Sequence, residues 1–248
     1  MALRTDKTGF GDIEIVQDDS MFCYGIDAVL LSDFAARRLN ERKKAISELC
    51  DLGTGNGIIP LILSHKTDIR RIVGVEIQEK CADLAEENAR RNGMQDRISF
   101  VRCNVKDMGT IEKLLGKKSF SAITMNPPYT EKGRGIAATC NEKNLARHEI
   151  SASLGDFIAC ASALLGDRGD FFMIHRPTRL ADIFTLLRKQ RIEPKEMQLI
   201  SGRKDETPNL VLLHCVKNGR PELNVLPQIF VREEDGSISE KIREIYEQ

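Results

Sequence analysis

The chain has 248 residues, 41% of them hydrophobic, and its 37 Lys and Arg residues balance its 37 Asp and Glu residues. This length suits one substantial hydrophobic core and leaves little for a second full domain. The zero net charge excludes a uniformly basic nucleic-acid-binding protein, so any nucleic-acid site must be a local basic surface.

Other features of the composition exclude further classes. No apolar run reaches the roughly 20 residues of a membrane span. The first 25 residues lack the basic start and apolar stretch of a signal peptide. The seven cysteines are scattered and form no C-x-x-C pair, which argues against both a disulfide framework and a zinc site. We therefore expect no metal, no membrane contact and a reducing, cytoplasmic location.

Strand and helix patterns alternate along most of the chain. A hairpin or extended arm around residues 13–16 comes first, and Asp27 is then expected to cap a helix at 28–39. This alternation predicts an α/β fold, doubly wound around a mainly parallel, seven-stranded Rossmann-like sheet. The predicted strands are 46–50, 71–77, 98–103, 119–125, 170–175, 196–200 and 209–217, and the predicted helices are 58–65, 79–92, 109–116, 151–165, 178–190 and 238–247.

A glycine-rich loop, Asp51–Gly57, follows the first of these strands. Its three glycines let the backbone turn sharply and approach a ligand, and the helix behind it offers free N–H groups to an anion. Glu76 stands 25 positions after Asp51, where a carboxylate can accept hydrogen bonds from ribose hydroxyls. A tight turn would also explain the glycines. Their Gly-x-Gly-x-Gly spacing departs from the dinucleotide pattern and counts against NAD.

The stretch Asn126-Pro127-Pro128-Tyr129 follows a later apolar strand. Neither proline can donate to a sheet, and each restricts the residue before it, so Asn126 is held stiffly at the carboxyl end of the strand. The amide of Asn126 offers an acceptor and donors, and the ring of Tyr129 offers a stacking face. Together they suit a flat heterocycle that carries an amino group. A Pro-rich turn with a surface Tyr is the alternative.

Ligands of doubly wound sheets bind outside the carboxyl ends of the strands. Polar residues stand at four predicted strand ends, which is the strongest indication of a site that does not depend on resemblance. These residues are Asp51, Glu76, Asn104 and Asn126.

The combination of Asp51–Gly57, Glu76 and Asn126–Tyr129 resembles the class I S-adenosylmethionine-dependent methyltransferases, in the branch that methylates amino groups. Segments 22–31, 146–149 and 203–205 are similar to the bacterial tRNA adenine N6-methyltransferases that act on adenine 37 of a valine tRNA. The resemblance covers nearly the whole chain. It implies an antiparallel edge strand in the sheet and three regions: an N-terminal arm and helix that pack on the catalytic domain (1–40), the methyltransferase domain (41–225), and a C-terminal tail with a short helix (226–248).

The resemblance also implies S-adenosyl-L-methionine as cofactor. Asp51 would interact with its ammonium group, Glu76 would hold its ribose, and Ile77 would lie on its adenine. At Asn104 the family usually has an acid that contacts the adenine amino group, and Asn can still accept this hydrogen bond without charge. Phe22 and Asp27 would close the pocket, although a core aromatic and a helix cap explain them equally well. The expected cofactor-binding set is Phe22, Asp27, Asp51, Gly53, Thr54, Gly55, Gly57, Glu76, Ile77, Asn104, Val105 and Asn126.

The expected catalytic residues are Asn126, Pro127 and Tyr129. The Asn126 side-chain oxygen and the Pro127 carbonyl would accept the two N6 hydrogens of an adenine, and Tyr129 would stack on the flipped base. Transfer of a sulfonium methyl group needs no base before the bond forms, so His148 is expected to be structural. Arg147 would hold either an RNA phosphate or an internal carboxylate.

Residues 176–204 carry eight Lys or Arg against three acids, which favours a local RNA-binding surface for a tRNA substrate. For 188–195 a solvated helix face explains the charges equally well. Rival functions are methylation of a protein glutamine at N5, methylation of a guanine at N2 in small-subunit rRNA, and RNA binding without catalysis. The expected RNA-binding residues are Lys132, Arg134, Arg176, Arg179, Arg203 and Lys204.

Overall fold

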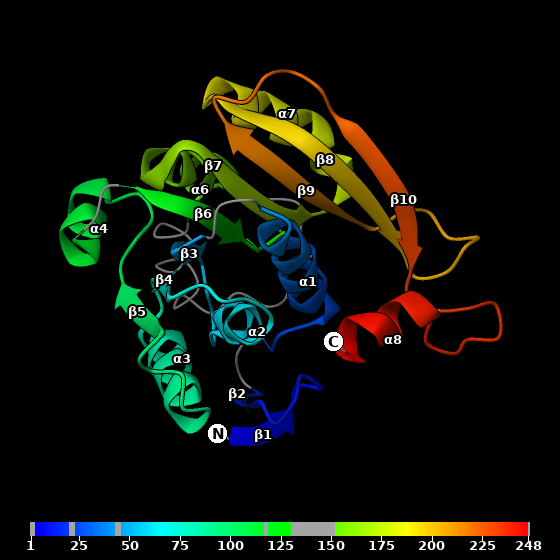
Figure 1. Ribbon diagram of the computed structural model, residues 1–248, viewed down its shortest axis with the longest axis horizontal. Coiled ribbons are helices and arrows are strands. Elements are labelled where there is room, and N and C mark those ends of the chain that lie inside the picture. The colour runs from blue at the N-terminus through cyan, green and yellow to red at the C-terminus, as the bar shows by residue number, and fades with distance from the viewer. Residues whose placement is uncertain (1–2, 20–22, 43–45, 117–118, 130–151, 248) are drawn as a thin grey trace, which may run out of the picture.

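The computed structural model describes residues 3–19, 23–42, 46–116, 119–129 and 152–247. An eight-stranded sheet, in the order β10-β8-β9-β7-β6-β3-β4-β5, forms its centre (Figure 1). Neighbouring strands run parallel except around β9, which is antiparallel to both β7 and β8. The strands are β3 (Glu48–Leu52), β4 (Arg71–Glu76), β5 (Ile98–Arg102), β6 (Phe120–Met125), β7 (Leu165–His175), β8 (Ile192–Ser201), β9 (Leu210–Lys217) and β10 (Asn224–Phe230).

The predicted fold class is confirmed, but the sheet has eight strands and not seven. The additional strand, β10, pairs in parallel with β8, so the expected boundary at residue 226 falls inside a strand. Apart from Ile229 its residues are exposed or half-buried, and they include Pro227, which an edge strand tolerates because one side of its backbone needs no partner. An edge strand of this kind lacks the apolar pattern that marked the other seven. The antiparallel strand that the resemblance implied is β9, which lies between β7 and β8 toward that edge of the sheet.

Helices cover both faces of the sheet, as in a doubly wound fold (Figure 1). Phe171 and Phe172 on β7 point to opposite faces, because successive residues of a strand alternate. Phe172 joins a core cluster with residues of α1, α2, α3 and α8, whereas Phe171 joins one with residues of α4, α6 and α7. The helices are α1 (Ile26–Asn40), α2 (Ile58–Lys66), α3 (Glu79–Arg91), α4 (Met108–Leu115), α6 (Leu154–Leu164), α7 (Leu180–Lys189) and α8 (Glu240–Glu247), with the 3-10 turn η1 (Pro177–Arg179) before α7.

An antiparallel hairpin, β1 (Leu3–Lys7) and β2 (Glu14–Asp18), precedes α1. Buried Asn88 of α3 anchors it, since its side chain accepts from the backbone N–H of Val16 at 2.7 Å and donates to the carbonyl of Val16 at 3.1 Å. Gln17 on β2 in turn accepts a hydrogen bond from the backbone N–H of Tyr24 at 3.0 Å. The hairpin thus helps to fix the chain just before α1 begins.

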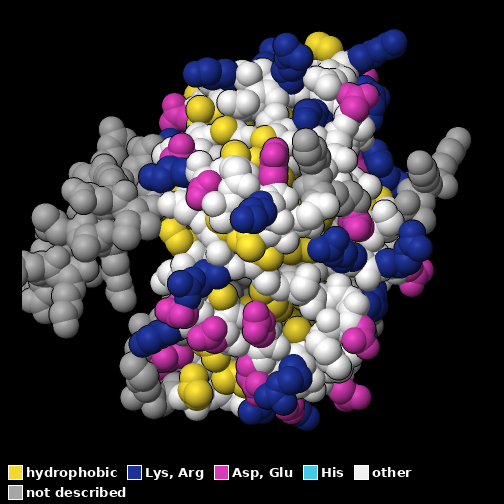
Figure 2. Space-filling model, turned by 90° about the vertical axis from the view of Figure 1, so that its left-hand side faces the viewer, with side chains coloured by type: hydrophobic (Ala, Val, Ile, Leu, Met, Phe, Trp, Pro, Cys, Tyr) yellow, Lys and Arg dark blue, Asp and Glu magenta, His cyan; other side chains and the backbone are white. Residues whose placement is uncertain are grey.

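Charged side chains of both signs are mixed over the face in Figure 2, with Lys and Arg most frequent at its upper end. This mixture agrees with the zero net charge of the chain. In the described part of the chain, no helix is both long and apolar enough to cross a membrane.

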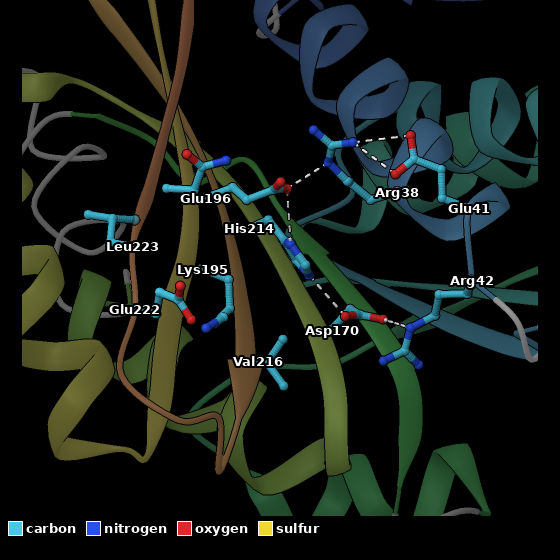
Figure 3. A pocket seen from close by; sticks show the side chains of 11 residues that line it. Arg38, Glu41, Arg42, Asp170, Lys195, Glu196, His214, Val216, Glu222 and Leu223 are labelled. Carbon is cyan, nitrogen blue, oxygen red and sulfur yellow. Dashed lines mark hydrogen bonds and ion pairs between the residues drawn. The ribbon is translucent and has the colours of Figure 1, made fainter.

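A network of charged side chains connects the end of α1 to the sheet (Figure 3). His214 on β9 lies between two carboxylates, with Nε2 at 2.9 Å from Asp170 and Nδ1 at 3.3 Å from Glu196. Arg38 forms an ion pair with Glu196 at 2.6 Å, and Arg42 forms one with Asp170 at 2.8 Å. The network lines a cavity of about 610 Å³ that also includes residues 222–224 at the amino end of β10. This cavity therefore lies away from the carboxyl ends of the parallel strands.

The protonation of His214 should make stability depend on pH. Burial lowers the pKa of His214, but its hydrogen bonds to Asp170 and Glu196 outweigh this and raise it above the ordinary value of 6.5. The stabilisation is then complete below the unfolded-state pKa and is lost as pH rises through the folded-state pKa. We predict that the free energy of unfolding, measured by urea denaturation from about pH 6 to about pH 9, falls with rising pH. In His214→Gln it should fall less steeply; equal slopes would contradict the prediction.

Candidate functional site

The carboxyl ends of β6, β3 and β4 meet at one edge of the sheet, because these parallel strands are neighbours. The register pairs Leu52 with Val75 on one side and with Met125 on the other. Gly53, Glu76 and Asn126, the residues that come next, therefore start at the same level. Sequence segments more than twenty positions apart become one site in this way.

The glycine loop has the backbone conformation that its residues suggested. Gly53, Gly55 and Gly57 have φ angles of 71°, 57° and 84°, which side chains with a Cβ rarely adopt. A Cβ on Gly57 would approach Phe100 to 3.0 Å and Ala85 to 3.1 Å, so packing is tight at this left-handed position. A Cβ on Gly55 would meet nothing within 4 Å, so the loop borders open space there, where a ligand can approach the backbone.

Glu76 is fixed at the end of β4 by three backbone donors. Its Oε2 accepts from the N–H of Gly55 at 3.0 Å, and its Oε1 accepts from the N–H groups of Ile77 and Gln78 at 2.9 and 2.8 Å. Oε2 has a second lone pair that none of these donors uses, so Glu76 can still accept from a ligand hydroxyl there. The side chain of Ile77 is 40% exposed next to it, an unusual exposure for an isoleucine that follows a buried strand.

Asp51 is fully buried and only partly satisfied. Its Oδ1 accepts a hydrogen bond from the hydroxyl of Thr124 at 2.7 Å. The hydroxyl of Thr54 also interacts with this carboxyl group, but neither it nor Asp51 Oδ2 makes a hydrogen bond of good geometry with any described residue. Burial raises the pKa of Asp51 to about 6, although the hydroxyls of Thr54 and Thr124 oppose this. Buried polar atoms without a partner are rare, so these two atoms indicate that a polar ligand group belongs here.

The Asn126–Tyr129 stretch follows β6 and forms hydrogen bonds with the first turn of α1. The Tyr129 hydroxyl lies 2.8 Å from Oδ2 of Asp27 and 2.9 Å from Oδ1 of Asn126, and the Asn126 amide nitrogen lies 3.3 Å from the same Asp27 oxygen. Burial, and then the charge of Asp27, raise the pKa of Tyr129 well above its ordinary value, so its hydroxyl keeps its proton. Pro127 is buried, whereas Asn126 and Tyr129 are half-buried and remain accessible to a ligand.

His175, which the sequence did not indicate, completes the surroundings of Tyr129. Its ring meets the Tyr129 ring edge-on at 5.2 Å, and its Nδ1 accepts from the backbone N–H of Arg176 at 2.8 Å. The guanidinium of Arg176 lies 5.2 Å from the centre of the Tyr129 ring. The sequence signal for His175 was its place at the end of β7, directly before a cation already under consideration.

The other expected site residues fall into three groups. Asn104 and Val105 follow β5; the side chain of Asn104 accepts from the N–H of Lys106 at 3.0 Å, and Val105 is buried. Arg203 and Lys204 are exposed after β8, at the same edge of the sheet as Asn126, whereas Arg179 pairs with Asp182 at 2.7 Å. The expected residues that lie outside the described part of the chain are Phe22, Lys132, Arg134, Arg147 and His148.

The chain matches the methyltransferase small domain family over residues 12–179. It belongs to this family. Relatives named tRNA1(Val) (adenine(37)-N6)-methyltransferase include one from Porphyromonas gingivalis, 30% identical over 84% of this chain and 77% of the relative. Another, from Escherichia coli, is 24% identical over 75% of this chain and 71% of the relative.

Solved structures of methyltransferases share the fold. A predicted O-methyltransferase from Agrobacterium tumefaciens superimposes with a TM-score of 0.69 at 21% identity, over 89% of this chain and 95% of that one. A ribosomal protein L11 methylase from Lactobacillus delbrueckii subsp. bulgaricus gives 0.55 at 18% identity, over 83% and 84% of the two chains. At such identities these structures support the fold alone.

The protein is an S-adenosylmethionine-dependent methyltransferase, with S-adenosyl-L-methionine as cofactor. The strand-end residues suit this cofactor. Asp51 and Thr54 offer buried polar atoms that lack a partner, Gly55 borders open space, and Ile77 exposes an apolar surface. In the described part of the chain, no group of three or more His, Cys, Asp or Glu side chains could hold a metal ion.

The raised pKa of Asp51 gives a test of its role. If its carboxylate pairs with the cofactor ammonium group, affinity should decrease as pH falls through about 6, because protonation removes the charge that attracts the ammonium. We predict that calorimetry with S-adenosylhomocysteine, which keeps this ammonium group, shows the decrease in the wild type. In Asp51→Asn, affinity should be weaker at about pH 8 and nearly independent of pH.

His214→Gln is the matched control, since it removes a remote titratable group whose pKa is also raised. It should keep the pH dependence of the wild type. The same pH dependence in Asp51→Asn and the wild type would exclude Asp51 as the partner of the ammonium group.

Proposed function

We propose that this protein transfers a methyl group from S-adenosyl-L-methionine to the exocyclic N6 of an adenine in tRNA, at adenine 37 of a valine tRNA. The observation that carries the proposal is the Asn126 amide. It is half-buried at the carboxyl end of β6, directly before buried Pro127, and β6 pairs with β3, the strand that leads into the glycine loop. The names of the relatives from Porphyromonas gingivalis and Escherichia coli support the choice of tRNA adenine.

Several residues are proposed to hold the cofactor, which supplies an activated methyl group as a sulfonium. Asp51 and Thr54 bind its ammonium group, Glu76 binds its ribose hydroxyls, and Ile77 covers its adenine. Asn104 accepts from the amino group of that adenine. The remaining members of the proposed pocket are Phe22, Gly53, Gly55, Gly57, Val105 and Asn126, and Asp27 borders it through its contacts with Asn126 and Tyr129.

The proposed chemistry depends on two acceptors. The lone pair of an adenine N6 is delocalised into the ring, which makes it a poor nucleophile. The Asn126 Oδ1 and the Pro127 carbonyl take the two N6 hydrogens and leave the lone pair directed toward the methyl group. The two prolines fix the backbone that carries both acceptors before the reaction. The acceptors therefore need little reorganisation, and most of the rate gain comes from positioning.

Tyr129 is proposed to stack on the flipped adenine, an interaction worth roughly 1–3 kcal/mol. The hydroxyl of Tyr129 stays protonated, so it does not act as a base. The basic residues Arg176, Arg203 and Lys204 are proposed to contact tRNA phosphates, together with Arg179, Lys132 and Arg134. Such contacts hold the tRNA in place without reading its sequence.

Nucleoside mass spectrometry of bulk tRNA tests the function directly. A strain that lacks this chain should lose N6-methyladenosine from its valine tRNA, and the wild-type gene should restore it. Asn126→Ala should not restore it, because removing one fixed acceptor lowers turnover by about 100-fold or more, while the variant still folds and binds cofactor.

Asn40→Ala is the matched control, since Asn40 donates to the Lys66 carbonyl at the far end of α1. It should restore the modification fully. Unchanged N6-methyladenosine in the deletion strain would refute the proposal, and loss of a protein glutamine methylation there would favour the rival acceptor.

The basic surface beside Asn126 gives a second test. We predict that Arg203→Glu with Lys204→Glu weakens tRNA binding and reduces the slope of log K against log salt by about 1 for each lost phosphate contact. Cofactor affinity should not change. Filter binding at several salt concentrations measures the tRNA affinity and its dependence on salt.

Arg188→Glu with Lys189→Glu makes the same change in charge at the end of α7, which returns toward the amino ends of the strands. This control should bind tRNA nearly as the wild type does. Equal weakening by both pairs would mean that only the overall charge matters and not this edge of the sheet.

A further inference from the structure

The Asp27 carboxylate contacts both Asn126 and Tyr129, which binding of the cofactor alone does not require. We propose that Asp27 is a positioning residue, which orients the Asn126 amide so that its oxygen faces the amino group of the substrate. This inference rests on the proposed function and adds a residue to it.

The Asp27 carboxylate is held on both sides. It is 9% exposed in the first turn of α1, where its Oδ1 accepts from the backbone N–H of Ala28 at 2.9 Å. Its Oδ2 lies 2.8 Å from the Tyr129 hydroxyl and 3.3 Å from the Asn126 amide nitrogen. Leu30 and Phe34 of the same helix are buried in the core, which holds α1 in place. The Asp27 carboxylate therefore does not move when the side chains of Asn126 and Tyr129 move.

An ionised carboxylate can only accept hydrogen bonds, whereas an amide has a donor side and an acceptor side. Asn126 must therefore turn its NH2 group toward Asp27, because the reversed amide would bring two oxygens together. The Asn126 oxygen is then directed away from Asp27. A donor bonded to a carboxylate is also polarised, which makes the oxygen of the same amide a better acceptor for an N6 hydrogen.

The Tyr129 hydroxyl contributes to the same arrangement. It has one hydrogen and lies within hydrogen-bond distance of both Asp27 Oδ2 and Asn126 Oδ1. In the free protein the Tyr129 hydroxyl can donate its hydrogen to the Asn126 oxygen. When a substrate amino group donates to that oxygen, the hydroxyl can give its hydrogen entirely to Asp27. Asp27 Oδ2 and Asn126 Oδ1 then each have a donor in either state.

Asp27→Asn tests the proposal, because it keeps the shape and removes an acceptor. The new amide cannot accept from Ala28 and from Asn126 at once, so either the helix cap is lost or the Asn126 amide reverses. We expect kcat for tRNA methylation to fall about 10- to 100-fold, with KM for tRNA and Kd for S-adenosylhomocysteine nearly unchanged. A Kd that rises with kcat unchanged at saturating cofactor would overturn the positioning role in favour of cofactor binding.

The matched control is Asp33→Asn on the same helix. Asp33 is 1% exposed and pairs with Arg37 and Lys66, away from Asn126. It should lower the melting temperature at least as much as Asp27→Asn does, with kcat close to the wild type. An equal fall of kcat in both variants would show that Asp27 acts only through the stability of α1.

A readout without substrate separates this inference from the proposed function. In the free protein labelled with 15N-asparagine, the Asn126 side-chain amide is identified by its absence from Asn126→Ala. Its protons should exchange slowly with solvent in the wild type and in Asp33→Asn, and faster, at a shifted resonance, in Asp27→Asn. An unchanged signal in Asp27→Asn would overturn the inference. A wild type that does not methylate tRNA would refute the function, and the NMR result would still decide the role of Asp27.

Discussion

The parallel register of β4, β3 and β6 is the constraint on which the site depends. Leu52 pairs with Val75 on one side and Met125 on the other, so three chain segments leave the sheet at one level. Gly53 and Thr54 then donate to the carbonyl of Val75 at 2.8 and 3.1 Å, which turns the glycine loop across the end of β4. A shift of one residue in this register would move every side chain to the opposite face and separate the groups that meet there.

Three buried carboxylates at this edge show how environment decides the role of one functional group. Glu76 accepts three backbone hydrogen bonds and is locked in place. Asp51 has an oxygen without a partner among the described residues, which costs free energy until a ligand supplies a donor. Asp27 is occupied by Asn126, Tyr129 and the backbone of Ala28. The first has both oxygens bonded within the chain, the second keeps an oxygen without a partner, and the third contacts three neighbours.

The elements of the fold could be read from local patterns because apolar runs, glycines and prolines act over a few residues. β10 was not predicted, because this edge strand contains Pro227 and its sequence has no alternation of apolar and polar residues. Arg179 was expected to bind RNA because it flanks a strand end, and only the structure shows that the turn before α7 also pairs it with Asp182. His175 was passed over because its place at a strand end does not indicate a function until Tyr129 lies against it.

The sequence by itself determined the order of the strands and helices, the stiff Asn-Pro-Pro-Tyr stretch and the left-handed glycines, because sterics and hydrogen bonding along the local chain set these features. Only the tertiary structure decided what those groups touch. The contact between Asp27 and Asn126 joins residues 99 positions apart. It exists because α1 packs on the sheet with its first turn beside the end of β6. The burial that leaves one oxygen of Asp51 without a partner also depends on this packing, since neither a distance nor a desolvation can be read from a linear pattern.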